Sequence, residues 1–138
     1  MKRRTDYLNS RIKDIVGELM EDSAIDEMNV HEKAMETPGI KAKWVQIYYE
    51  ESGFLKRIED KLETTKAEYM KKYGETSDEP AFMVDRKISE NKDIKKLERA
   101  ISDQKEIVKY VYEINKSVWQ GFSYDVKNII DLLKLESM

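Results

Sequence analysis

Basic and aromatic side chains alternate near the middle of the chain, and they are the residues whose types and spacing could do chemistry. The set comprises Lys56, Arg57, Lys61, Lys66, Tyr69, Lys71, Lys72 and Tyr73. Lysine and arginine neutralise phosphates and release counterions, and tyrosine rings stack on unpaired bases. This combination is typical of proteins that bind single-stranded nucleic acid without sequence preference.

A second interpretation of the same residues is a solvated helix face. Glu68 and Lys72 are four residues apart and would form an ion pair on a helix surface. Tyr69 also falls on an apolar stripe, so that its ring would belong to the core rather than to a binding site. The residues alone leave both interpretations open.

Side chains that support catalysis are sparse. The chain has no cysteine, which excludes disulfides, thiol catalysis and cysteine-ligated zinc. His31 is the single histidine, and no glycine-rich phosphate loop, Gly-x-Ser-x-Gly or His-Glu-x-x-His motif is present. Carboxylate pairs such as Glu50-Glu51 are expected among 28 acidic residues on solvated helices. We therefore predict a protein that is not an enzyme and needs no metal or cofactor.

The composition favours elongated helices over a thick globular core. Of the 138 residues, 40% are hydrophobic and 38% are charged, with five glycines and two prolines. No stretch approaches the ~18 apolar residues of a membrane span, so we expect a soluble intracellular protein. The net charge is −3, but residues 21–36 are strongly acidic and residues 38–74 mildly basic, so that a nucleic-acid site would be a local patch.

The basic residues are expected to lie on a long helix over residues 37–74. Thr37 and Pro38 are suited to its first positions, and Gly74 to its end. An apolar seam with alternating steps of four and three contains Trp44, Tyr48, Glu51, Leu55, Ile58, Leu62, Thr65 and Tyr69. A helix of about 36 residues, roughly 54 Å long, needs a partner of similar length.

A second long helix over residues 91–120 supplies that partner. Its seam also alternates three and four, with Gln104 and Asn115 as polar members that set register. Residues 75–90 are expected to form an acidic loop, in which Phe82, Val84 and Ile88 alternate as in a short strand. The seams predict two long antiparallel amphipathic helices.

The two ends of the chain are expected to add shorter helices. Residues 1–36 predict short N-terminal helices, and residues 121–138 a C-terminal helix that drives oligomerisation. Its predicted assembly residues are Phe122, Val126, Ile129, Ile130 and Leu133. Gly121 is expected to kink the chain or to let a neighbouring backbone approach. The whole chain, residues 1–138, is thus predicted to be one all-α domain.

The order and spacing of several short sequences resemble the UvsY family of recombination mediators from T4-like bacteriophages. The resemblance covers about residues 22–136. Its anchors are Ile25-Asp26, Lys43-Trp44, Arg57-Ile58-Glu59, Tyr73-Gly74, Lys92-Asp93-Ile94 and Gly121-Phe122. None of these anchors is specific alone, and their succession carries the resemblance.

The resemblance implies a phage recombination accessory protein without catalytic activity. Such mediators bind single-stranded DNA, form homo-oligomeric rings of six or seven subunits, and help to load a RecA-like recombinase onto strands covered by single-strand-binding protein. The family's DNA-binding motif is a lysine and an arginine two apart, and its best match is Lys66-Ala67-Glu68. Glu68 reverses the arginine's charge, and Lys71 and Lys72 one turn later would substitute for it.

Two function classes remain as alternatives at this point. The first is a recombination mediator that acts in DNA repair and replication in the cytoplasm of an infected bacterial host. The second is a coiled-coil scaffold or adaptor with no nucleic-acid role, which the heptad seams support equally well.

Overall fold

The computed structural model describes residues 6–76 and 80–137, and this part of the chain consists of helices without a strand. The helices are α1 (Asp6–Ser23), α2 (Val30–Thr76), α3 (Ala81–Glu90), α4 (Lys92–Ile114), the π-helical segment η1 (Asn115–Trp119) and α5 (Gln120–Glu136). The predicted all-α class is confirmed. None of the described helices is long and apolar enough to cross a membrane.

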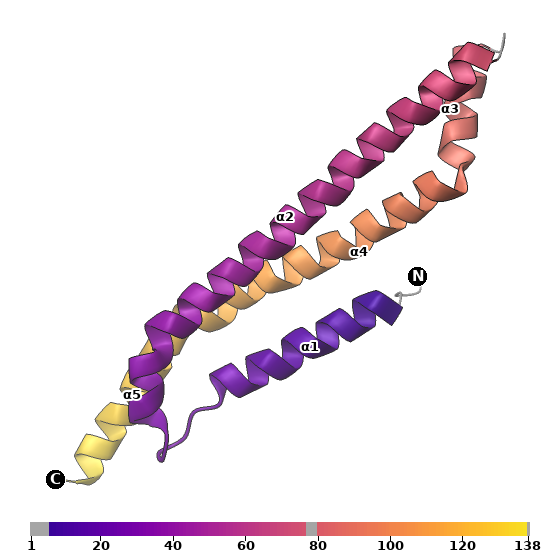
Figure 1. Cartoon of the computed structure of the whole chain (residues 1–138). Helices are drawn as coiled ribbons and strands as arrows, with labels where there is room; N and C mark the ends of the chain where they lie inside the picture. The colour runs from indigo at the N-terminus through magenta and orange to yellow at the C-terminus, as the bar shows by residue number, and fades with distance from the viewer. Residues whose placement is uncertain (1–5, 77–79, 138) are drawn as a thin grey trace.

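An antiparallel pair of long helices forms the body of the molecule (Figure 1). α2 runs the length of the structure, and α4, η1 and α5 return beside it as one nearly continuous rod. The predicted polar seam residues meet each other in this pairing. The Gln104 side-chain amide donates to the Glu51 carboxylate at 2.7 Å and to the Glu51 carbonyl at 2.9 Å. Asn115 donates to the carbonyl of Trp44 at 3.1 Å.

The main hydrophobic core lies at the end of the hairpin that holds α1 and α5, which we call the base. Its buried members are Leu8, Ile15, Val30, Ile40, Trp44, Ile107, Val111, Ile114, Trp119, Phe122 and Val126. The rings of Trp44 and Trp119 lie 5.8 Å apart between centroids, and Phe122 meets Trp119 edge-on at 4.9 Å. Large aromatic side chains thus fill the space where α2, η1 and α5 converge.

The opposite end of the hairpin, which we call the tip, holds a smaller core. Val84 and Ile88 of α3 and Ile94 of α4 are buried there, with Leu62, Tyr69 and Tyr73 of α2 packed against them. The expectation of a loop with a short strand across residues 75–90 is wrong for Ala81–Glu90, which is helical; residues 77–79 lie outside the described part. The spacing of Val84 and Ile88 is one helical turn, which buries both on α3.

The first long helix begins earlier than the sequence indicates. Thr37-Pro38-Gly39 was expected to mark its start, but α2 begins at Val30 and Pro38 lies inside it. The hydroxyl of Thr37 donates to the carbonyl of Lys33 at 2.6 Å and adds a bond at the turn where Pro38 supplies no N–H. The helix therefore tolerates the proline, and the true boundary is the turn at residues 27–29.

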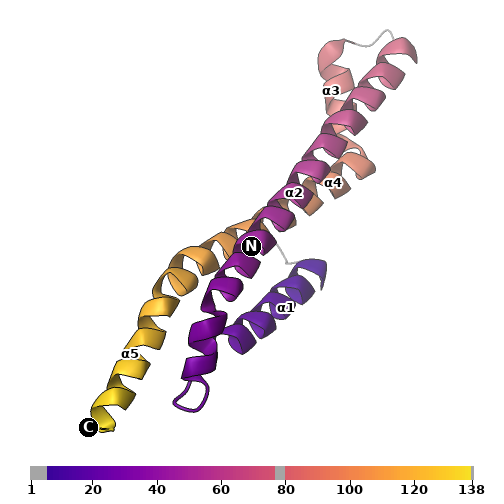
Figure 2. The same cartoon turned by 60° about the vertical axis from the view of Figure 1, so that its left-hand side comes forward.

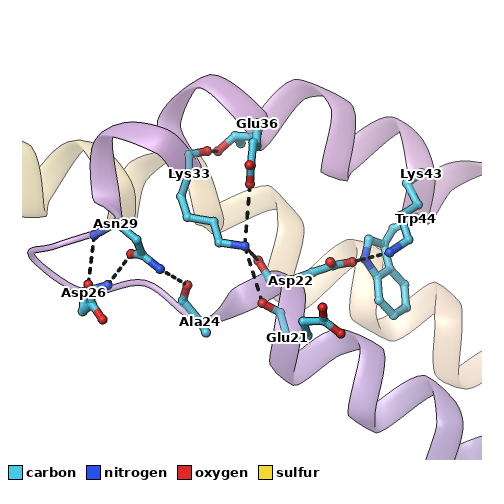
Figure 3. A network of polar contacts seen from close by, with 10 residues as sticks. Glu21, Asp22, Ala24, Asp26, Asn29, Lys33, Glu36, Lys43 and Trp44 are labelled. Atoms are coloured by element: carbon cyan, nitrogen blue, oxygen red, sulfur yellow. Dashed lines mark hydrogen bonds and ion pairs between the residues drawn. The ribbon is translucent and has the colours of Figure 1, made fainter.

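Helix α1 lies along the base of the hairpin and is held by charged side chains (Figure 2). Arg11 of α1 binds the buried Glu51 of α2, its Nε lying 3.1 Å from Oε1. At the other end of α1, Asp22 accepts bonds from Lys43 Nζ and Trp44 Nε1, each at 2.8 Å (Figure 3). Burial alone would lower the pKa of Lys43, but its contacts with Asp22 and Glu18 raise the pKa above its ordinary value.

The connection between α1 and α2 is a short turn closed by its own side chains. The Asp26 carboxylate accepts the backbone N–H groups of Met28 and Asn29, at 2.8 and 2.9 Å (Figure 3). The Asn29 amide donates in return to the carbonyl of Ala24 at 3.1 Å. These bonds satisfy backbone groups of the turn that would otherwise be unpaired.

The position of the bend in the returning rod also differs from expectation. Gly121 was predicted to kink the helix or to admit a neighbouring backbone, but a Cβ at this position would meet nothing within 4 Å. The irregular segment is η1, six to two residues earlier, where the hydrogen-bond pattern widens to the π form. The close-approach explanation for Gly121 is therefore wrong.

Candidate nucleic-acid interface

The predicted basic residues of α2 divide over several faces of the helix. Arg57 and Lys61 are one turn apart, and Lys72 returns to the same face about three turns later, at 3.6 residues per turn. Lys56 and Lys71 are exposed as well, but each lies about 100° around the helix from the residue that follows it. The side chains of Arg57, Lys61 and Lys72 therefore form one exposed row, which we call the α2 row.

Lys66, the residue that matches the family motif, lies on the flank that faces α4. Its Nζ is 3.9 Å from Oε1 of Glu98, and both side chains are about half exposed, at 46% and 48%. An exposed pair at this distance contributes little to stability, so that a phosphate could compete for Lys66. The structure thus separates Lys66 from the α2 row.

Tyr69 and Tyr73 pack into the tip core instead of projecting into solvent. Their rings stack on each other with centroids 5.6 Å apart. The Tyr69 hydroxyl donates to the Asp93 carboxylate at 2.7 Å, and this bond raises the pKa of Tyr69 above its ordinary value. Tyr73 accepts a bond from the Asn91 amide at 3.4 Å. The structure therefore agrees with the interpretation of Tyr69 as a core residue. Stacking on a nucleobase would require both tyrosine rings to leave this cluster.

A row of cations on α4 was missed in the sequence. Lys92, Lys95, Lys96 and Arg99 follow the spacing i, i+3, i+4 and i+7, so that they share one face of the helix, and all four are exposed. Ile94 and Ile101 are buried on the side of α4 that packs in the hairpin. Within the part of the chain that the structure describes, no ion pair joins these four residues to a carboxylate. We call them the α4 row.

The α4 row could have been predicted from its spacing. Its cations occur every three or four residues, as apolar residues do on the buried face of a helix. Its neighbours Asp93, Glu98 and Asp103 cancel much of its charge when the charge is averaged over the segment. Four unpaired cations within two turns would present a linear array to a phosphate backbone. Asn91 caps the same helix end by accepting from the N–H groups of Asp93 and Ile94.

The residues predicted for assembly belong largely to the chain's own core. Phe122 and Val126 are each only 3% exposed and pack in the base. Ile129, Ile130 and Leu133 are partly buried against the same cluster. The aliphatic side chains that α5 leaves in solvent are Leu132 and Leu135, at 60% and 67% exposure, and its Tyr124 is exposed as well. A contact between copies would therefore find these two leucines rather than Phe122 or Val126.

The described residues contain no cluster of three or more histidine, cysteine, aspartate or glutamate side chains that could hold a metal ion. His31 is exposed on the first turn of α2. Of the carboxylate pair at Glu50-Glu51, Glu51 is buried and bonded to Arg11 and Gln104, whereas Glu50 is exposed. These carboxylates thus have different environments and different structural roles.

Comparison with known proteins places this arrangement in one family. Residues 18–138 match the family model described as "Recombination, repair and ssDNA binding protein UvsY". The match includes α2, α3, α4, η1 and α5 but only the last turns of α1. No curated protein and no solved structure shows significant similarity to the chain.

Proposed function

Because this chain belongs to the UvsY family of recombination, repair and single-stranded DNA binding proteins, we propose that it is a recombination mediator. In this proposal it binds single-stranded DNA, assembles into a hexameric or heptameric ring, and promotes loading of a RecA-like recombinase onto strands covered by single-strand-binding protein. It would act without catalysis of its own, in the cytoplasm of the infected bacterial host. The family match over 121 residues, from 18 to 138, is the observation that carries the proposal.

The exposed cations support a physical mechanism of this kind. The α4 row and the α2 row each offer phosphates a line of positive charge on a helix stiffened by the hairpin. A strand held along such a line exchanges condensed counterions for side chains, so that affinity depends steeply on salt. A ring repeats each row in every subunit, and many weak contacts then add through effective concentration. A strand held in this way is displaced from its resident binding protein and offered to the recombinase.

The test compares the two rows by fluorescence anisotropy with labelled oligo-dT over a series of salt concentrations. One variant carries Lys92→Gln, Lys95→Gln and Lys96→Gln, and another carries Arg57→Gln, Lys61→Gln and Lys72→Gln. Each lost phosphate contact on a single strand lowers the slope of log affinity against log salt by about 0.7, so that a row in contact loses roughly 2. Gel filtration and circular dichroism show that both variants keep the fold.

A third variant controls for net charge. Lys13→Gln, Lys127→Gln and Lys134→Gln remove the same charge from exposed positions on α1 and α5. Its salt slope should equal that of the unmodified protein. Absence of oligo-dT binding by the unmodified protein at low salt would contradict the DNA part of the proposal and leave the scaffold function as the explanation.

The assembly part of the proposal has its own test. Leu132→Glu with Leu135→Glu places charge on the apolar surface that α5 exposes and leaves the buried Phe122 and Val126 untouched. We expect native mass spectrometry to show a smaller species than the unmodified protein, because charged side chains resist burial between copies. An unchanged mass would exclude this surface as the contact.

A further inference from the structure

A groove of about 410 Å³ opens beside η1, and its lining residues belong to neither cation row. It is lined by Lys41 and Val45 of α2, Tyr112 of α4, Asn115, Lys116 and Trp119 of η1, and Gln120 of α5. This volume lies within the range of roughly 300–1,000 Å³ that is common for small-molecule sites. Neither the family description nor the predicted DNA residues include this groove.

The π form of η1 shapes one wall of the groove. π segments insert an extra residue into a helical turn and are frequent at functional sites. The Asn115 amide holds this segment in place by donating to the carbonyls of Trp44 and Val111, each at 3.1 Å. The widened turn is thus tied to α2 by a specific bond and is a stable feature of the wall.

The two tryptophans of the base differ in one respect that bears on the groove. Trp44 Nε1 donates to the Asp22 carboxylate at 2.8 Å. Trp119 is 2% exposed, lines the groove, and its Nε1 has no acceptor among the described residues. A buried indole N–H without a partner is costly, and a ligand atom that accepts from it would recover a hydrogen bond the chain lacks.

The remaining lining supplies charge and apolar surface. Lys41 and Lys116 form no ion pair with a carboxylate within the described ranges. The side chains of Tyr112 and Val45 are 49% and 45% exposed and offer a flat aromatic ring beside a methyl surface. A ligand that satisfies all of these groups has a planar ring with a hydrogen-bond acceptor and an attached anion.

We propose that this groove binds one nucleotide unit. The base lies against Tyr112 and Val45, the phosphate lies between Lys41 and Lys116, and a ring acceptor takes the Trp119 N–H once the indole turns toward the groove. The nucleotide comes either from a single strand, in which case the inference rests on the proposed function, or from a free mononucleotide. A strand engaged here would have one nucleobase held in this groove, and its phosphates would contact the cation rows on the protein surface.

The test uses thymidine monophosphate and the intrinsic fluorescence of the chain, which has two tryptophans. We expect the nucleotide to change the emission of Trp119, and thymidine or inorganic phosphate alone to bind at least several-fold more weakly. Trp119→Phe keeps a ring but removes the N–H, and should abolish the emission change and weaken binding measured by calorimetry. Circular dichroism of this variant checks that the fold is retained.

A matched pair of variants separates the groove from general charge. Lys41→Gln with Lys116→Gln should weaken thymidine monophosphate binding roughly tenfold, because two phosphate contacts at the rim of the groove are lost. Lys13→Gln with Lys127→Gln removes the same charge from exposed positions of α1 and α5 outside both cation rows, and should leave mononucleotide binding unchanged. Competition between thymidine monophosphate and oligo-dT assigns the groove to a strand, and binding without competition assigns it to a free nucleotide.

Two results would overturn the proposal. One is the absence of thymidine monophosphate binding at millimolar concentration together with normal oligo-dT binding by the groove variant. The other is a change of native mass in that variant, which would make the groove a contact between copies. Failure of oligo-dT binding by the unmodified protein refutes the mediator function but leaves mononucleotide binding in the groove to be measured separately.

Discussion

The base and the tip of the hairpin both pack helices around a hydrophobic core, but the core of the base is the larger of the two. At the base, side chains from α1, α2, α4, η1 and α5 enclose two tryptophans and a phenylalanine. At the tip, three buried aliphatic residues and two tyrosines hold α2, α3 and α4 together. Both ends add a third helix to the pair, but α1 at the base has 18 residues, whereas α3 at the tip has only 10 (Figure 2).

This difference indicates how stability and function are divided along the rod. Buried apolar area provides most of the folding free energy, so that the base stabilises the chain. The tip half carries the α4 row and most of the α2 row on helices with little core beneath them. Cationic side chains must be exposed to contact a charged polymer, and those of the tip half are exposed rather than buried.

The largest effect that would sharpen this comparison is expected for Trp44→Ala. Trp44 has no exposed surface and packs on Trp119, so that its truncation should lower the free energy of unfolding by about 3–5 kcal/mol. Urea unfolding followed by circular dichroism measures this. Tyr49→Ala, at a 68% exposed position of the same helix, is the control and should stay within about 0.5 kcal/mol.

At the tip, Ile88→Ala should cost about 2 kcal/mol, the lower end for such a truncation, since few neighbours surround the side chain. We expect the loss to be local, because the tip core shares no buried residue with the base core. Native-state hydrogen exchange should show faster exchange in α3 and unchanged exchange around Val111. Equal acceleration at both ends would mean that the chain unfolds as one unit.

The contact that joins α1 to the hairpin offers a smaller effect. A double-mutant cycle with Arg11→Ala and Glu51→Gln should give a coupling of about 1 kcal/mol, since Arg11 is 33% exposed and Glu51 only 11%. Denaturant unfolding of the four proteins measures it. Arg86→Ala with Glu90→Gln, an exposed pair at 3.3 Å, provides the comparison and should couple more weakly. A coupling near zero for Arg11 and Glu51 would mean that this ion pair does not help to hold α1 on the hairpin.

The smallest effect is expected for Tyr69→Phe at the tip. The bond to Asp93 raises the pKa of Tyr69, so that its stabilisation is present below the ordinary value of 10.0 and is lost as pH rises through the raised pKa. Melting temperatures at about pH 8 and pH 11 should therefore differ less for the phenylalanine variant than for the unmodified protein. An equal pH dependence in the two proteins would show that the hydroxyl contributes nothing at the tip.

The fold could be predicted well where a signal repeats along the helix. The seam of Trp44, Tyr48 and Leu55 indicated α2 because apolar residues every three or four positions can be buried together only on a helix. The helix over 81–90 was missed because an acidic neighbourhood and short length hid a spacing of one turn between Val84 and Ile88. The start of α2 was misplaced because the local sequence Thr37-Pro38-Gly39 is compatible both with the first turn of a helix and with a proline inside a helix.

The candidate site was predicted less completely. The basic character of α2 was evident, but the sequence could not decide that Tyr69 and Tyr73 turn toward Asp93 and Asn91, which lie 24 and 18 residues further along the chain. The α4 row has a helical spacing that is present in the sequence, but the neighbouring carboxylates mask its positive charge. The groove beside η1 gave no signal, since its lining comes from residues 41 to 120.

The sequence by itself determined that this chain is helical, that its helices carry polar seam residues, and that it belongs with the recombination proteins. Helical periodicity is a local property of the backbone, so that one segment suffices to show it. Only the tertiary structure decided that Gln104 meets Glu51 across 53 residues. It also decided that, among the described residues, the indole N–H of Trp44 has an acceptor and that of Trp119 has none. These outcomes depend on the register of one helix against another, which is set by the whole packed interface rather than by any single segment.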